Sequence, residues 1–154
     1  MRNWYWLWMA AICFVGCEAK PEVIPVFPVS GQVLYAGAPA AGVRVYLLPT
    51  SAPMVPQVPT NPYAVTDQSG NFRMTTYTQG DGAAEGGYQI VMLWPDENQA
   101  ETETGSTDKL LGWYDGANTQ LTLVVKTGDN LIPPIQIPVI SGPPAERQGV
   151  PGRN

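Results

Sequence analysis

Histidine is absent from this 154-residue chain, and cysteine occurs only twice. Without histidine the chain lacks the commonest general base and zinc ligand, and it has no Ser–His or Cys–His nucleophile pair. Charged residues are also scarce at 14%, and a net charge of −5 with no basic stripe argues against nucleic-acid binding. No ten-residue stretch has a helical period, and no apolar run reaches the roughly 20 residues that a membrane-spanning helix needs. These absences predict a non-enzymatic chain that needs no cofactor and binds no nucleic acid.

Glycine and proline, by contrast, are abundant, with sixteen of each. They lie between short apolar runs, which is the pattern of turns between the strands of an all-β fold. The chain is long enough for one domain and too short for two comfortable ones.

The N-terminus has the pattern of a secretory signal. A single basic residue, Arg2, precedes an apolar stretch that is rich in Trp and Leu and ends in Phe14-Val15-Gly16-Cys17. This ending resembles the lipobox of bacterial lipoproteins, with Phe14 in place of the usual Leu. The resemblance implies that residues 1–16 are a lipoprotein signal peptide and that Cys17, acylated on its thiol, becomes the first mature residue.

Lipidation of this kind would place the protein in the cell envelope, held to a membrane through acyl chains on Cys17 and facing the periplasm or the exterior. Cys13 lies inside the signal, so the mature chain would have no thiol left for a disulfide. Residues 17–28 contain three prolines and predict an extended, semi-rigid tether.

From Val29 onward, apolar and polar residues alternate with period two, which is typical of half-buried strands. We predict a seven-stranded antiparallel β-sandwich of prealbumin or immunoglobulin type over residues 29–139, followed by a flexible tail over 140–154. Residues 88–94 are apolar on both faces and predict a central strand covered on both sides. Pro133 and Pro134 confine the last strand to an edge. The seven expected strands are 29–35, 43–47, 63–66, 72–75, 88–94, 121–125 and 131–137.

Three stretches together resemble the carboxypeptidase regulatory-like (transthyretin-like) domain of many bacterial lipoproteins. They are the strand opening and turn over residues 29–43, the Thr-Asp-x-x-Gly-x-Phe signature over residues 66–72, and the glycine-rich approach to a Tyr-led strand over 80–88. In the second stretch, Asp67 and Gly70 are expected to form a structural turn. The resemblance implies a non-catalytic surface module. The hydrolases of the transthyretin-like family rely on histidine, which this chain lacks.

Two features remain as candidate sites. Five carboxylates over residues 95–109 could offer oxygen ligands to calcium or form a glycosidase-like pair, but their spacing fits no known calcium loop and favours a solvated acidic loop. Trp113 and Tyr114 lie beyond this segment and serve either packing or recognition. Trp94 continues an inward-facing row and is expected in the core, whereas other tyrosines are scattered over strands and loops. The five carboxylates are Asp96, Glu97, Glu101, Glu103 and Asp108, and the scattered tyrosines are Tyr35, Tyr46, Tyr63 and Tyr77.

Two functions of different classes therefore remain open. The first is a non-catalytic, lipid-anchored envelope protein that makes protein–protein contacts or gives structural support. The alternative is a carbohydrate-binding module that holds a polysaccharide at the cell surface, with Trp113 as its candidate contact. The expected partners are thus a membrane, an envelope protein or a polysaccharide.

Overall fold

The structure is a computed structural model that describes residues 23–51, 61–96 and 107–144. The predicted signal peptide and residues 17–22 of the predicted tether, Cys17 included, lie outside the described residues, as do Glu97, Glu101, Glu103 and residues 145–154.

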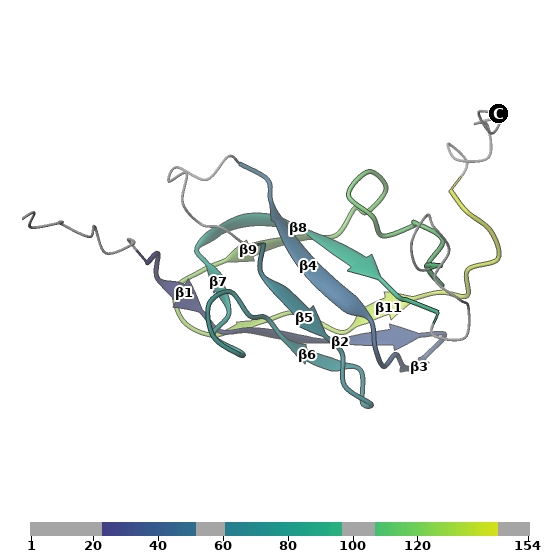
Figure 1. The fold of residues 1–154 in the computed structure, drawn as a ribbon, viewed down its shortest axis with the longest axis horizontal. Helices are drawn as coiled ribbons and strands as arrows, with labels where there is room; N and C mark the ends of the chain where they lie inside the picture. The colour runs from purple at the N-terminus through teal and green to yellow at the C-terminus, as the bar shows by residue number, and fades with distance from the viewer. Residues whose placement is uncertain (1–22, 52–60, 97–106, 145–154) are drawn as a thin grey trace, which may run out of the picture.

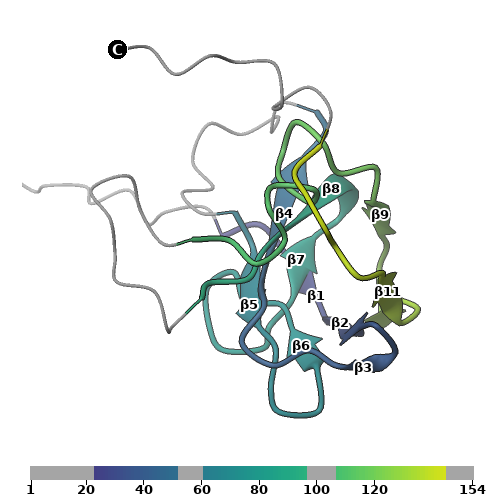
Figure 2. The same cartoon turned by 90° about the vertical axis from the view of Figure 1, so that its right-hand side faces the viewer.

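The described part of the chain is all-β, as predicted, and its strands stack into a sandwich of two layers (Figures 1 and 2). One layer is the antiparallel sheet β5-β4-β8-β9, and the other is built around β2, which pairs with β3, β6, β10 and β11. The strands are β1 (Val26–Phe27), β2 (Val29–Tyr35), β3 (Ala38–Pro39), β4 (Arg44–Pro49), β5 (Tyr63–Val65), β6 (Asn71–Arg73), β7 (Ala83–Ala84), β8 (Gly86–Leu93), β9 (Thr122–Val125), β10 (Asn130–Leu131) and β11 (Ile135–Ile137).

The period-two pattern of the sequence fills the space between the layers. Buried residues alternate with more exposed ones along three strands: Val29, Gly31 and Val33 in β2, Val45 and Leu47 in β4, and Tyr88, Ile90 and Met92 in β8. The side chains with no exposed surface include Val33, Val43, Val45, Leu47, Met74, Leu110 and Val125. Burial of one such side chain stabilises the folded protein by about 1.5–3 kcal/mol, so this apolar layer holds the two sheets together.

Two predictions about the sheets need correction. The described residues form eleven strand segments rather than seven, because β1, β3 and β7 are additional two-residue strands and the last predicted strand is divided into β10 and β11. Pro133 and Pro134 lie at this division, where they have no N–H to donate to a ladder. Among the described strands, both halves pair only with β2, so the predicted edge position is confirmed.

The sandwich is not wholly antiparallel, because β10 and β11 run parallel to β2. The chain passes from β9 in one sheet to β10 in the other through a turn after Lys126, so β9 and β10 do not pair as a hairpin. A parallel neighbour needs a long crossover, and here the strands between β2 and β10 supply it. Alternation of apolar residues does not specify strand direction, so the sequence could not show this pairing.

Strand β8 lies between β4 and β9, as its two apolar faces indicated. Its inner face is buried, but its outer residues Gln89, Val91 and Leu93 are only half-buried, so the outer face is not fully covered. The segment after residue 107 gives part of that cover, since the side-chain amide of Gln89 donates to the carbonyl of Thr119.

At both ends, the described fold reaches past the expected domain bounds. Val26 and Phe27, within the predicted tether, pair with β7, and Ile140, within the predicted tail, packs against the core. The described chain begins at the β1 end of the sandwich, and its C-terminal residues leave from the opposite end (Figure 1).

Candidate binding groove

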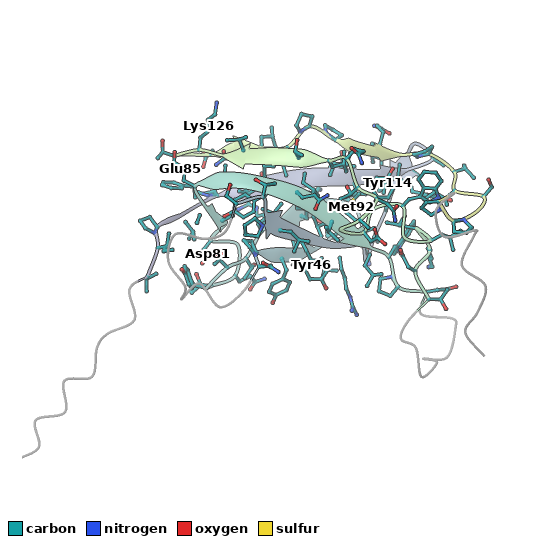
Figure 3. The ribbon with its side chains drawn as sticks, turned by 90° about the horizontal axis from the view of Figure 1, so that it is seen from above. Tyr46, Asp81, Glu85, Met92, Tyr114 and Lys126 are labelled. Atoms are coloured by element: carbon teal, nitrogen blue, oxygen red, sulfur yellow. The ribbon has the colours of Figure 1, made fainter. Side chains whose placement is uncertain are left out.

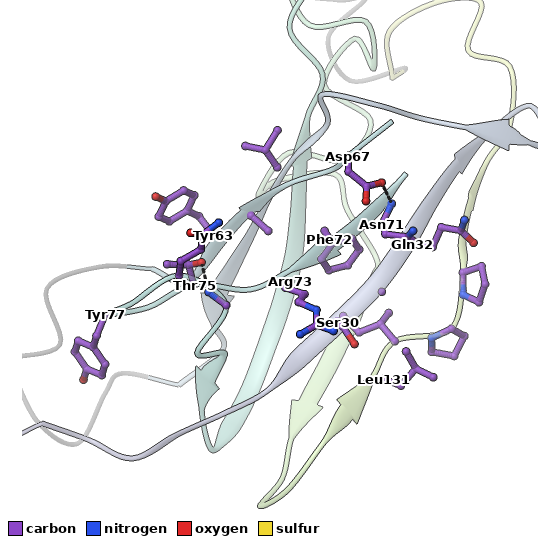
Figure 4. Close-up of a pocket in the computed structure, with 18 residues that line it drawn as sticks. Ser30, Gln32, Tyr63, Asp67, Asn71, Phe72, Arg73, Thr75, Tyr77 and Leu131 are labelled. Carbon is purple, nitrogen blue, oxygen red and sulfur yellow. Dashed lines mark hydrogen bonds between the residues drawn. The ribbon is translucent and has the colours of Figure 1, made fainter. Parts of the chain in front are cut away.

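An open groove runs over the outward-facing side chains of β5, β6, β2 and β10, with a volume of about 1380 Å³ (Figure 4). It lies on one continuous surface because Tyr63 and Thr75 exchange two backbone hydrogen bonds, which join β5 of one sheet to the end of β6 in the other. Alternation along each strand turns Ala64 and Phe72 toward the core and their neighbours outward. We refer to this surface as the groove.

The polar side chains of the groove come from two adjacent strands. Ser30 pairs with Arg73, and Gln32 pairs with Asn71, in the antiparallel register of β2 and β6. The amide of Gln32 donates to the carbonyl of Ser69. The side chains of Ser30, Asn71 and Arg73 make no hydrogen bond or ion pair with any residue in the described ranges. Three neighbouring polar side chains are thus available to a ligand.

The apolar side chains of the groove are unusually exposed. Of the eight large hydrophobic residues that are exposed in the described part of the chain, four line the groove. Exposed apolar groups that gather in one place mark interaction sites, whereas single ones need no explanation. The four are Tyr63 at 50%, Val65 at 55%, Tyr77 at 39% and Leu131 at 79% relative exposure.

The loop between β6 and β7 positions Tyr77 at one end of the groove (Figure 4). The carboxylate of Asp81 accepts the backbone N–H groups of Thr76, Tyr77 and Thr78 at 2.7, 2.9 and 2.8 Å. The hydroxyl of Thr75 accepts the N–H of Gly80 at 3.0 Å and closes the loop further. Because one carboxylate holds three successive amides, the position of the Tyr77 ring depends on Asp81.

The same hydrogen bonds change the acidity of Asp81. Burial alone would raise the pKa of this carboxyl, but the backbone N–H groups of Thr76, Thr78, Tyr77 and Asp81 itself outweigh it and leave the pKa below its usual value. The loop is therefore stabilised by the ionised form of Asp81.

We expect Asp81→Asn to lower the free energy of unfolding at neutral pH by about 1 kcal/mol, because an amide replaces the ionised acceptor of three N–H groups. The folded pKa of Asp81 is depressed, so its contribution is present above the unfolded value of 3.8 and is lost as the pH falls through the folded value. Urea unfolding of both proteins from pH about 6 to about 2 should show two stabilities that converge. A difference that stayed constant over this range would contradict this role of Asp81.

Asp67 and Gly70 join β5 to β6 at the other end of the groove. One carboxylate oxygen of Asp67 accepts the N–H groups of Ser69 and Asn71 at 2.8 and 2.9 Å (Figure 4). Gly70 has a φ of +73°, and a Cβ there would overlap the carbonyl oxygen of Val33. This turn directs Asn71 and Arg73 to their partners on β2 and so sets the polar part of the groove.

The aromatic pair singled out in the sequence lies elsewhere. Trp113 is 44% exposed, and its indole N–H donates to the carbonyl of Gly142 at 2.6 Å. Tyr114 packs against the core, where burial raises the pKa of its phenol. It lies toward the end of the sandwich opposite Asp81 (Figure 3). Neither residue lines the groove.

Trp94 is partly buried against the core rather than fully within it. Its ring meets that of Tyr35 edge-to-face at 5.3 Å between centroids, and the ammonium of Lys109 lies 5.1 Å from its centroid. These contacts tie the base of the predicted acidic segment to β2.

The two described carboxylates of the acidic segment have local partners. Asp108 accepts the backbone N–H groups of Trp94, Leu110 and Gly112 at 2.9–3.0 Å, which organises the turn. Asp96 lies 3.7 Å from the ammonium of Lys109. Within the described residues, no group of three or more His, Cys, Asp or Glu side chains could hold a metal ion.

The groove residues were missed because the sequence does not show which strands are neighbours. Alternation over the expected strand 72–75 places Arg73 on its outward face but does not indicate a site there, and Tyr63 and Tyr77 appeared only among scattered tyrosines. The one local signal was the exposed pattern around Ala64, where Tyr63 and Val65 occupy outward positions of a short strand.

No helix in the described ranges has the length and apolar character to cross a membrane.

The fold and the groove together define the described part of the protein as an all-β sandwich that carries a groove of mixed polar and aromatic side chains. No protein-family model matches the chain, and no curated protein matches it either. Among solved structures, it is similar to a DUF3823 family protein from Parabacteroides merdae ATCC 43184, with 14% identity, a TM-score of 0.38, and coverage of 76% of this chain and 47% of that one. It is also similar to a 9R-lipoxygenase from Cyanothece PCC8801, with 13% identity, a TM-score of 0.38, and coverage of 79% and 18%. The chain thus spans less than half the length of either.

Proposed function

We propose that the chain is a non-catalytic, lipid-anchored cell-envelope protein that holds a partner in its groove. The observation that carries this proposal is the gathering of four of the eight exposed large hydrophobic side chains at one place, beside three polar side chains without partners in the described residues. Of the two partners expected from the sequence, a polysaccharide fits this mixed lining best. Contact with an envelope protein is the second candidate, favoured by the exposure of Val65 and Leu131.

The absence of histidine from the whole chain supports a non-catalytic role. Three of the described carboxylates are also engaged in structure, since Asp67, Asp81 and Asp108 each accept two or more backbone N–H groups. A carboxylate that holds a turn in this way is poorly placed to exchange protons with a substrate. The proposed role is therefore binding and display.

The lipobox resemblance at residues 14–17 supports the anchor, and the three motifs over residues 29–88 support a transthyretin-like domain. The described chain enters the sandwich at the β1 end (Figure 1). An anchor at Cys17 would hold that end toward the membrane, through a mature segment of ten residues or fewer before β1. The groove lies along the side of the sandwich, so it would stay open to the envelope space.

Cys17→Ser tests the anchor. We expect the wild-type protein to incorporate radiolabelled palmitate and to sediment with membranes, because one thioether-linked diacylglycerol together with an N-terminal acyl chain gives stable attachment. The variant should incorporate no label and appear in the soluble fraction. Cys13→Ser is the matched control and should behave as wild type. A Cys17→Ser protein that still sediments with membranes would overturn the anchor.

A further inference from the structure

The central strand beneath the groove, β2, already has a paired neighbour on each side. Strand β2 has β6 on one side and β10 on the other, and β6 in turn meets β5 through the pair Tyr63 and Thr75. A peptide that adds to a sheet needs a free strand edge for its main-chain hydrogen bonds. Strand β2, in the middle of the groove, therefore has no free edge, and the contacts that it offers to an occupant come from side chains.

Those side chains suit the chemistry of a sugar. Ser30, Gln32 and Asn71 provide hydroxyl and amide groups that both donate and accept hydrogen bonds, as sugar hydroxyls do. Tyr63 and Tyr77 provide flat rings with a polar tip, on which the apolar face of a sugar ring can stack. Figure 4 shows these two tyrosines at one end of the groove and Arg73 with Ser30 near its middle.

Arg73 adds a positive charge to this lining, which favours a ligand with a negatively charged group. The chain has a net charge of −5, yet the guanidinium of Arg73 has no ion-pair partner in the described ranges. Asp67 also lines the groove, but one of its carboxylate oxygens is occupied by two amides of the β5–β6 turn. A guanidinium exposed in this way presents a fork of donors that matches a carboxylate or sulfate.

We propose that the groove binds an extended acidic glycan, with the carboxylate or sulfate of one sugar at Arg73 and a neighbouring ring against Tyr63 or Tyr77. Thr75, the bridge partner of Tyr63, lies two positions from Arg73 on the same face, about 7 Å along the chain. Adjacent sugar units of one polymer cover such a span. This inference rests on the proposed function, since it names the ligand class of the same groove.

The test uses the full-length protein in detergent and two matched pairs of probes. Each pair has one acidic and one neutral member on the same polymer: oligogalacturonate with its methyl ester, and dextran sulfate with dextran. We expect at least one acidic probe to bind at least about tenfold more tightly than its neutral partner, with an affinity that falls as salt rises.

Arg73→Gln should weaken binding of that acidic probe about tenfold and leave the neutral probe unchanged, because only the charge-assisted contact is lost. Arg44→Gln is the matched control, since Arg44 is an exposed arginine on β4 outside the groove, and it should bind as wild type. A double variant, Tyr63→Ala with Tyr77→Ala, should weaken binding of both members of the pair. Equal thermal unfolding of wild type and Arg73→Gln shows that the fold is intact.

The outcomes separate this inference from the proposed function. Equal binding of acidic and neutral probes, unaffected by Arg73→Gln, overturns the acidic specificity and leaves a polysaccharide contact standing. Binding of none of the four probes overturns the glycan inference, and capture of an envelope protein that depends on Leu131 would then assign the groove to the second candidate. Membrane attachment through Cys17 is measured separately and depends on neither result.

Discussion

Gly82→Ala is expected to lower the free energy of unfolding by about 3 kcal/mol or more, which is at the severe end for a single substitution. Gly82 has a φ of +103°, and a Cβ there would overlap the carbonyl oxygen of Phe27 and press on the nitrogen of Pro28. Both obstacles are backbone atoms, so no side chain can rotate away. The N–H of Gly82 also donates to the carbonyl of Met74, which limits movement on the other side. Urea unfolding followed by circular dichroism measures the loss.

Gly128→Ala is the control that separates crowding from backbone strain. Gly128 has a similar φ of +94°, but no atom lies within 4 Å of the position that a Cβ would take. We expect this variant to lose only about 1 kcal/mol, the cost of a side chain at positive φ. If the two variants were equally destabilised, the close approach of β1 to the β6–β7 loop would not be a stabilising feature of the fold.

Thr66→Val is expected to cost about 3 kcal/mol, because two buried backbone groups would lose their hydrogen-bond partner. Thr66 is only 4% exposed. Its hydroxyl donates to the carbonyl of Ala40 at 2.6 Å and accepts the N–H of Val43 at 2.9 Å. Valine has nearly the same shape, so the change removes the hydroxyl and leaves no large cavity. Denaturant midpoints at constant slope would measure the difference.

Thr122→Val provides the matched comparison on an exposed strand. Thr122 lies on β9 with its side chain in solvent, and valine has an equally high strand propensity there. Its substitution should change stability by no more than about 0.5 kcal/mol. A Thr66→Val protein as stable as Thr122→Val would mean that the backbone near Ala40 and Val43 finds other partners at little cost.

Part of the fold could be predicted from the local pattern, because the alternation of apolar and polar residues along one strand indicates which of its side chains are buried. Val43, Val45 and Leu47 are buried and Arg44 is exposed, as their alternation indicated. The positions of the longer strands along the chain follow from the glycine- and proline-rich turns that separate them. Strand direction did not follow: β2 and β11 pair in parallel although nearly 100 residues separate them, and no local property of either strand encodes that partner.

The candidate site was harder to predict than the fold. Trp113 attracts notice in a sequence because large aromatic residues often bind ligands, but here its indole is engaged with the carbonyl of Gly142. Tyr63, Tyr77 and Arg73 are unremarkable in the sequence, since each is a single exposed residue on a short strand or loop. Their significance comes from sharing one groove, which depends on the pairing of β5, β6 and β2.

By itself, the sequence determined that this protein is all-β and which face of each longer strand is buried, because side-chain alternation and turn residues act over a few neighbouring positions. It also carries the pattern behind the proposed anchor at Cys17, which needs no folded structure. Only the tertiary structure decided that Ser30 lies beside Arg73, that the hydroxyl of Thr66 bonds to Ala40 and Val43, and that Tyr63 and Tyr77 line one groove. These features arise where distant parts of the chain come together, and contacts of that kind have no local signature.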